Sequence, residues 1–202
     1  RVILLLNPCM RKIIIMIGPP GSGKGTQAKK IAAKYNYHHL SSGDLLRALA
    51  GKPELNSLEK SAVAQMKSGQ LVSDELIYSL VFNEIEKDLA AGKGVVLDGA
   101  IRNFEQAQGF QNFFKAKNLS AEVLALEIAL NDKDSFDRLT KRRDLENRQD
   151  DDPKIIKERI AKQGNVVLKP IINFYKKLGV LKKIDGNQTI ENVEKDINKI
   201  LC

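Results

Sequence analysis

Apolar and polar residues alternate along the chain in blocks that predict strands and helices in turn. Short β-branched or apolar runs predict buried strands, at residues 12–17, 94–99, 121–130 and 181–184. Longer stretches with apolar residues at helical spacing predict helices, at residues 24–35, 45–49, 58–66, 74–90, 104–117, 132–143, 153–178 and 190–201. Strands that alternate with helices indicate an α/β fold, with a parallel β-sheet covered by helices on both faces.

Two segments fall outside this alternation. Residues 42–72 are helical with no strand, and residues 140–152, TKRRDLENRQDDD, are densely charged. A chain of 202 residues that is 43% hydrophobic can bury one sizeable core. We therefore expect a single domain over residues 10–202, with 42–72 and 140–152 as excursions from it. We interpret Met10 as the natural start and residues 1–9 as an N-terminal extension.

Apolar runs and cysteine positions indicate where such a protein would work. The longest apolar runs, residues 2–6 and 13–17, are far shorter than the roughly 20 residues of a membrane span, so we expect a soluble protein with no membrane partner. Cys9 and Cys202 lie near opposite ends and form neither a disulfide framework nor a metal-ligand pair by spacing. A reducing cytoplasm fits this pattern.

The positive charge of the chain is concentrated in one region. Residues 133–183 hold 15 Lys or Arg against 8 Asp or Glu, in a chain whose net charge is +8. A nucleic-acid-binding surface, a pocket for several phosphates and a solvated lysine-rich helix face would each have this charge. Nucleic-acid binding is disfavoured because aromatic residues are only 5% and no base-stacking motif is present.

The segment GPPGSGK, residues 18–24, fits the pattern G-x-x-x-x-G-K and lies between a predicted strand and a predicted helix. Backbone N–H groups at such a junction converge on a concavity that, with the helix dipole, binds phosphate oxygens. We expect Lys24 to reach the β- and γ-phosphates of a nucleotide. Residue 25 is glycine and the hydroxyl comes one position later, at Thr26, so the usual Mg²⁺-binding Ser or Thr directly after the lysine is absent.

Other polar residues extend the phosphate site. Asp98 ends the predicted strand VVLD at the sheet edge where ligands collect in open α/β folds, and we expect it near Mg²⁺, through water. His38 and His39 are interpreted as ordinary residues at a strand entrance. Phosphoryl transfer is catalysed mainly by positioning and charge neutralisation, which favours convergence of the scattered arginines on one site. These are Arg47, Arg102, Arg138, Arg142, Arg148 and Arg159.

In these and neighbouring segments the chain resembles the nucleoside monophosphate kinases, and most closely the adenylate kinases. The resemblance extends from about residue 11 to residue 201. The resemblance rests on GPPGSGKGTQ, LSSGDLLR, GQLVSDEL, LDGAIRNFEQA, DRLTKRR and RQDDDPKIIKERI. It implies a P-loop NTPase fold with a helical NMP-binding insertion over residues 42–72 and a short lid over 140–152.

The resemblance also implies roles for individual residues. The residues expected to bind ATP are Gly21, Ser22, Gly23, Lys24, Gly25, Thr26, Arg138, Arg142 and Gln188. The residues expected to bind AMP are Ser42, Arg47, Gln70, Leu71, Val72, Gly99, Arg102, Gln106, Arg148 and Arg159. The residues expected to act in catalysis are Lys24, Arg102, Arg142, Arg148 and Arg159, with Asp98 toward the metal.

The sequence departs from the family pattern in two places. Ala100 and Ile101 stand where an aromatic residue and a proline are usual, so we expect a softer loop before Arg102 and weaker AMP binding. Only residues 144–147 separate Arg143 from Arg148, which resembles the short-lid form that needs no structural zinc.

The resemblance implies Mg²⁺-dependent transfer of a phosphate from ATP to AMP, giving two ADP, by a cytoplasmic monomer in nucleotide biosynthesis. A UMP/CMP kinase of the same family is the alternative. A GTPase-like switch is less favoured, because residues 131–134, Asn-Asp-Lys-Asp, have the wrong order for the guanine motif N-K-x-D.

Overall fold

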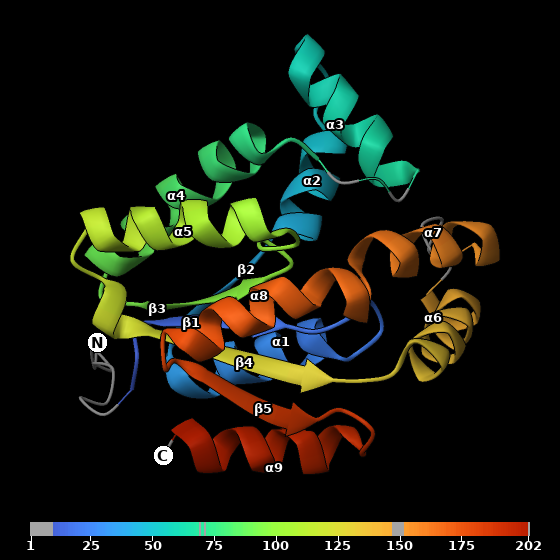
Figure 1. Cartoon of the computed structure of the whole chain (residues 1–202). Helices are drawn as coiled ribbons and strands as arrows, with labels where there is room; N and C mark the ends of the chain where they lie inside the picture. The colour runs from blue at the N-terminus through green and yellow to red at the C-terminus, as the bar shows by residue number, and fades with distance from the viewer. Residues whose placement is uncertain (1–9, 69, 71, 147–151, 202) are drawn as a thin grey trace.

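The computed structural model of the chain describes residues 10–68, 70, 72–146 and 152–201. Its centre is a five-stranded sheet with the order β2-β3-β1-β4-β5, in which every neighbouring pair is parallel (Figure 1). The strands are β1 (Ile13–Ile17), β2 (Tyr37–Ser41), β3 (Gly94–Asp98), β4 (Val123–Ala129) and β5 (Leu181–Asp185). The predicted parallel sheet is thereby confirmed.

Helices cover both faces of this sheet, and others project beyond it. The helices of the described residues are α1 (Lys24–Tyr35), α2 (Ser42–Ala50), α3 (Ser57–Lys67), α4 (Asp74–Ala90), α5 (Phe104–Ala116), α6 (Asp132–Glu146), α7 (Pro153–Gln163), α8 (Asn165–Lys177) and α9 (Ile190–Leu201), with a 3₁₀ turn η1 (Ser120–Glu122). Successive residues of β1 point to opposite faces, so Ile13 and Ile15 pack with α4, α5 and α8 while Ile14 packs with α1 and α9. A strand buried on both faces must be apolar throughout, which explains the run IIIMI.

Side chains just outside the helices fix where several of them begin. The Ser41 hydroxyl accepts a hydrogen bond from the Asp44 backbone N–H at 3.2 Å and caps α2. Asn56 and Glu59 form a reciprocal capping box at the start of α3. Asn103 caps α5 by accepting from the Gln106 backbone N–H at 2.6 Å. These caps satisfy backbone donors that the first helical turn leaves unpaired.

The single helix predicted over residues 153–178 is wrong, because the chain forms two helices that meet at Gly164. The backbone of Gly164 is extended, and the glycine both ends α7 and precedes α8. The Asn165 side chain then donates to the carbonyl of Leu130 at 2.9 Å and to the carboxylate of Asp132 at 2.7 Å, which ties the junction to the end of β4. The break lets α8 pack on the sheet while α7 packs against α6 beyond its edge (Figure 1).

The strand β2 was not among the four strands predicted from the hydrophobic pattern. Its sequence, YHHLS, has too few apolar residues to stand out, and its conformation is fixed by pairing with β3 over residues 37–41. His38 and His39 lie inside this strand rather than at its entrance, and adjacent strand residues point to opposite faces.

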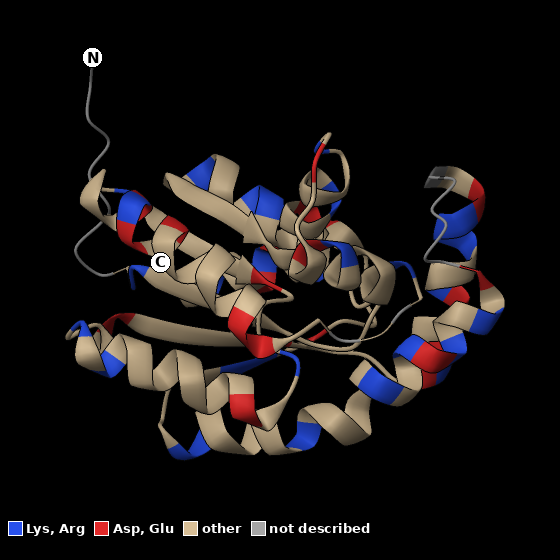
Figure 2. Cartoon of the chain, turned by 90° about the horizontal axis from the view of Figure 1, so that it is seen from above, with Lys and Arg blue, Asp and Glu red and all other residues tan. Residues whose placement is uncertain are grey.

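Two groups of helices project beyond the sheet at its carboxyl end. After β2, α2 and α3 follow each other with no strand in the described part of residues 42–72, and they rise away from the sheet (Figure 1). On the other side, α6 and α7 pack against each other and carry closely interspersed basic and acidic residues (Figure 2). Residues 147–151 of the expected lid lie outside the described residues, as do residues 1–9 with Cys9, and Cys202. None of the described helices combines the length and the apolar character needed to cross a membrane.

We predict that Gly94→Ala destabilises the sheet. A Cβ at residue 94 would lie 2.4 Å from two ring atoms of Tyr37, and this ring cannot swing aside because it is 5% exposed and its hydroxyl donates to the Arg11 carbonyl. Overpacking of this kind costs about 1–3 kcal/mol of unfolding free energy, measurable by urea denaturation. In the control Gly51→Ala, the new Cβ meets no atom closer than 3.5 Å, and stability should change by less than about 0.5 kcal/mol. Equal stability of the two variants would contradict the packing argument.

Candidate active site

A cleft of about 340 Å³ lies at the carboxyl edge of the sheet, between the two projecting groups of helices. Its floor is the loop after β1 together with the end of β3. Its walls come from α2 on one side and from α6 and α7 on the other. Parallel strands end at a common edge, so residues far apart in the sequence meet here.

The loop of residues 18–23 wraps around the start of α1. Gly21 and Gly23 have φ angles of +79° and +91°, which residues with a side chain rarely adopt. The hydroxyl of Ser135, on α6 and fully buried, donates to the Pro20 carbonyl and ties the loop to the neighbouring helix. The loop is thus held in shape by its glycines and by a contact that sequence reasoning missed.

Lys24 folds back over this loop. Its Nζ donates to the carbonyls of Gly18 and Pro19 at 2.7 and 2.8 Å. Burial, together with the positive charges of Arg102, Arg159 and Arg142, lowers the pKa of Lys24 from 10.5 to about 8, against the opposing effect of Asp98. The structure therefore gathers more positive charge around this ammonium group than one carboxylate balances, which is the electrostatic signature of a site for anions.

Asp98 faces Lys24 across the cleft and contacts His39, whose Nε2 lies 3.4 Å from Oδ2 of the carboxylate. Burial alone would raise the pKa of Asp98, but the hydrogen bond with His39 and the charges of Lys24 and Arg102 outweigh it and lower the pKa. The carboxylate therefore stays ionised at neutral pH. An ionised carboxylate that lines a cleft is a suitable partner for hydrated Mg²⁺, which keeps several of its waters. A Cβ at residue 25 would lie 3.0 Å from Oδ2 of Asp98, which explains why glycine suits that position.

Arg102 lines the cleft and is oriented by polar contacts with other parts of the chain. Its Nε donates to the Gly99 carbonyl at 2.7 Å, and its Nη1 donates to Oε1 of Gln163 at 3.1 Å. Its Nη2 lies 3.5 Å from the Ser42 hydroxyl, which itself donates to the Gly99 carbonyl at 2.7 Å. The guanidinium is thus oriented before any ligand arrives, which reduces the ordering that binding would require.

The structure brings most of the predicted site residues together. Those that line the cleft are Gly21, Gly23, Lys24, Gly25, Thr26, Arg47, Gln70, Val72, Asp98, Gly99, Arg102, Arg138, Arg142 and Arg159. Ser22 and Ser42 are buried just behind this lining. Leu71 and Arg148 lie outside the described residues, so their roles remain predictions.

Two predicted residues are not among those that line the cleft. Gln106 is 2% exposed and is not part of the lining; its Oε1 accepts from the Arg102 backbone N–H at 2.6 Å, and its Nε2 donates to Asp74 at 2.9 Å. Gln188 is also outside the lining, with its Nε2 donating to the Asp185 carbonyl and to Asp196 at 3.0 and 3.2 Å. Either amide would have to exchange these partners before it could contact a nucleotide.

The loop before Arg102 is packed more firmly than the sequence suggests. Ala100 and Ile101 are 1% and 6% exposed and belong to the hydrophobic core. The packing of this loop therefore gives no sign of the softness that we expected.

Three residues at the cleft were missed by sequence reasoning. Gln163 holds Arg102, His39 holds Asp98, and Ser135 holds the loop after β1. Each acts across a long sequence separation, and none belongs to a motif on which the resemblance rests. For His39, its place two residues before the segment SSGD was the only local signal.

Similarity to known proteins covers this whole region. A family model described as adenylate kinase matches residues 16–180, a range that contains every residue of the cleft lining. A protein of Prochlorococcus marinus (strain NATL2A) named adenylate kinase is 37% identical over 193 residues, covering 95% of this chain and 100% of the relative. Proteins with the same name from Thermobifida fusca (strain YX) and Staphylococcus aureus (strain Mu50) are 35% and 34% identical, covering 89% and 93% of this chain and 93% and 98% of their own lengths. On this evidence the chain belongs to the adenylate kinase family.

Proposed function

We propose that this protein transfers the γ-phosphate of ATP to AMP, giving two ADP, in a reversible Mg²⁺-dependent reaction. The observation that carries the proposal is the convergence of Lys24, Arg102 and Arg159 with Asp98 on one cleft of an adenylate kinase fold. Two phosphorylated nucleotides bring many negative charges into one place, and a cleft rich in fixed cations offsets their repulsion.

The two sides of the cleft suggest where each nucleotide binds. The loop after β1, the start of α1 and the arginines of α6 would hold the phosphates of ATP, with backbone N–H groups and Lys24 as donors. Arg102, held by Gly99 and Gln163, would hold the phosphate of AMP, and Arg47 on α2 would add a second cation. Nη2 of Arg47 donates to Oδ1 of Asp44 at 2.5 Å, so the guanidinium would have to leave this carboxylate to contact the phosphate of AMP.

Mg²⁺ would be held by the phosphates of ATP and, through water, by Asp98. When bound, the ion supplies charge neutralisation on the transferring phosphate. The chain does not need a general base, because a phosphate monoester with a second pKa near 6 is already mostly anionic at neutral pH. His39 is accordingly assigned to positioning Asp98 and not to proton transfer.

We further propose that residues 42–72 close over AMP and residues 140–152 over ATP, which keeps water away from the phosphate in transfer. The two sides of the cleft already contact each other. Oε1 of Gln70 accepts a hydrogen bond from Nζ of Lys162, and Nε2 of Gln70 lies 3.5 Å from Oε2 of Glu158 on the same helix, α7. Arg148 and Leu71 keep their proposed roles within these segments. Lid closure of this kind occurs in microseconds to milliseconds, and adenylate kinase is itself a standard example of it.

The proposal includes the setting of the enzyme. We infer that it acts as a monomer in the cytoplasm, within nucleotide biosynthesis, on ATP, AMP and ADP and without nucleic-acid or membrane partners. The absence of a cysteine framework in the sequence supports a reducing compartment. No feature of the cleft favours a UMP/CMP kinase. The acceptor-nucleotide assay described below would nevertheless reveal one.

The first prediction concerns protonation of Lys24. Its pKa is about 8 in the free protein, and phosphate anions beside it would raise that value. Above pH 8 the free side chain is largely neutral, so ATP binding should take up protons and should weaken as the pH rises. Isothermal titration calorimetry in buffers of different ionisation enthalpy measures this uptake.

The Lys24→Met variant should lose the proton uptake and most turnover, and its Tm should not fall, because Lys24 lies at the cleft and not in the hydrophobic core. Lys34→Met removes an exposed lysine from the same helix and should keep both properties. Near-normal turnover in Lys24→Met, or unchanged proton uptake, would place the phosphates elsewhere.

The second prediction concerns Gln163 as a positioning residue. Gln163→Leu removes the acceptor for Arg102 Nη1, and a hydrogen bond to a charged group contributes about 1.5–3 kcal/mol, so KM for AMP should rise at least about tenfold. KM for ATP should change little. Gln163→Glu keeps an acceptor oxygen and should restore KM for AMP. Equal changes in both KM values would indicate a general structural defect instead.

The third prediction concerns the acceptor nucleotide. At fixed MgATP, kcat/KM for AMP should exceed the values for CMP, UMP and GMP by about 10². A preference for CMP or UMP would identify the protein as a UMP/CMP kinase. The Gln106→Leu variant separates two possible roles of Gln106. If Gln106 contacts the base, the variant should lower the ratio of kcat/KM for AMP to kcat/KM for CMP. If Gln106 only supports Arg102, the variant should lower kcat/KM for both acceptors and leave their ratio unchanged.

A further inference from the structure

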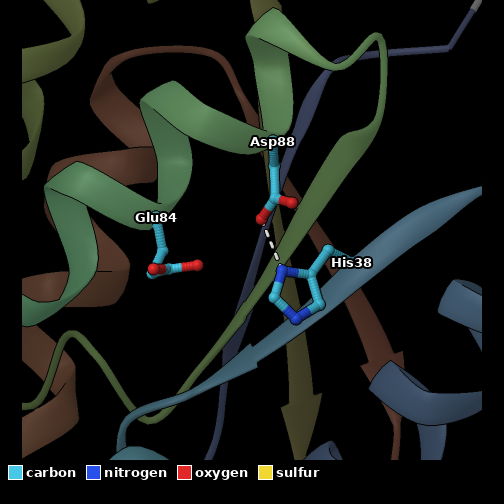
Figure 3. A group of neighbouring side chains, drawn as sticks. All are labelled: His38, Glu84 and Asp88. Atoms are coloured by element: carbon cyan, nitrogen blue, oxygen red, sulfur yellow. Dashed lines mark hydrogen bonds and ion pairs between the residues drawn. The ribbon is translucent and has the colours of Figure 1, made fainter.

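A second group of polar side chains lies on the other face of β2, away from the cleft. His38 on this edge strand and Glu84 and Asp88 on α4 project into the same space (Figure 3). The ligand atoms that these side chains offer all lie within 4.8 Å of one another. Glu84 and Asp88 are four residues apart and therefore lie on one face of the helix. None of these residues has a part in the proposed phosphoryl transfer.

Asp88 is unusual within this group because it is a carboxylate that is only 7% exposed. Its side chain contacts Nδ1 of His38, whereas the His38 and Glu84 side chains are 42% and 34% exposed. A buried carboxylate is costly unless it is paired, and here its neighbours are an imidazole and a second carboxylate. The group thus has a buried inner ligand and an open outer side through which an ion can enter.

We propose that His38, Glu84 and Asp88 bind a divalent transition-metal ion of the Zn²⁺ type. Zn²⁺ binds histidine nitrogen and carboxylate oxygen at about 2.0–2.2 Å, and sites with three protein ligands are completed by water. Ligand atoms around such an ion are about 3.5 Å apart, so the partly exposed Glu84 side chain has to move inward by roughly 1 Å and the His38–Asp88 contact has to open slightly.

The ligand set also indicates which ions are excluded. Imidazole suits Zn²⁺, Co²⁺ and Ni²⁺, whereas Mg²⁺ prefers oxygen ligands and gives up its water reluctantly. The Mg²⁺ that accompanies ATP is therefore a poor competitor. The competitor within the protein is Lys87, whose Nζ lies 3.6 Å from the Glu84 carboxylate in an exposed ion pair of little stabilising effect.

A bound ion would fasten β2 to α4. These are the elements that lead into and out of residues 42–72, because β2 ends at Ser41 and α4 begins at Asp74. An edge strand has a neighbour on one side only, so an added link to a helix stabilises it where the sheet gives least support. The proposed metal site would therefore stabilise the contact between β2 and α4, and it is separate from the cleft.

The test is a Zn²⁺ titration of the full chain by calorimetry, without nucleotide, because phosphates bind the ion themselves. Wild-type protein should bind one more Zn²⁺ than Glu84→Gln, or bind it more than about tenfold more tightly, since loss of even an outer partner of a metal site weakens affinity by 10–100-fold. Glu84 is partly exposed and at the surface end of the group, so this variant should fold. His38→Asn should show the same loss, and millimolar Mg²⁺ should leave the wild-type result unchanged.

Two control variants separate a defined site from attraction to negative charge. Glu86→Gln removes a carboxylate from the same helix that pairs with Lys117, and it should bind Zn²⁺ as the wild type does. Lys87→Met removes the competitor and should strengthen binding. Zn²⁺ should also raise the Tm of the wild type more than that of Glu84→Gln. Wild-type affinity in both Glu84→Gln and His38→Asn would overturn the proposal, and so would equal losses in Glu84→Gln and Glu86→Gln.

Discussion

The central constraint on this structure is that several positively charged side chains lie close to Lys24 before any anion is bound. Lys24 donates to two carbonyls of the loop that precedes it, and burial together with three arginines from other elements lowers its pKa. Like charges this close repel, so they stay together only if stiff elements hold them. The β1 strand, buried on both faces, supplies one anchor, and the Ser135 contact with the loop supplies another.

The same constraint explains the polar network around Arg102. Its guanidinium would otherwise move away from Lys24, but contacts with Gly99, Gln163 and Ser42 hold it. Asp98, kept ionised with help from His39, offsets part of the positive charge. The cleft is thus poised for anions, and the energetic penalty of gathering its cations is met by folding and not by ligand binding.

The break at Gly164 shows how the fold serves this arrangement. A straight helix over residues 153–178 would have to lie either on the sheet or along α6. Divided in two, it packs α8 against the core and places Arg159 and Gln163 at the cleft. Helical periodicity continues through the break, so the sequence pattern does not reveal it; the Asn165 bonds to Leu130 and Asp132, which fix it, join distant parts of the chain.

By itself the sequence determined the parallel α/β fold and the glycine-rich loop after β1, and its resemblance to a family indicated about half of the residues that line the cleft. The fold and the loop follow from local signals: β-branched runs, helical spacing and a glycine pattern whose geometry is set within a few residues. Only the tertiary structure decided that Tyr37–Ser41 is a strand and that the amides of Gln106 and Gln188 are bonded within the chain. It also decided that Gln163, His39 and Ser135 hold the working groups of the cleft. The physical reason is that a hydrogen bond between residues far apart in sequence leaves no periodic trace, because its partner is chosen by the packing of whole elements.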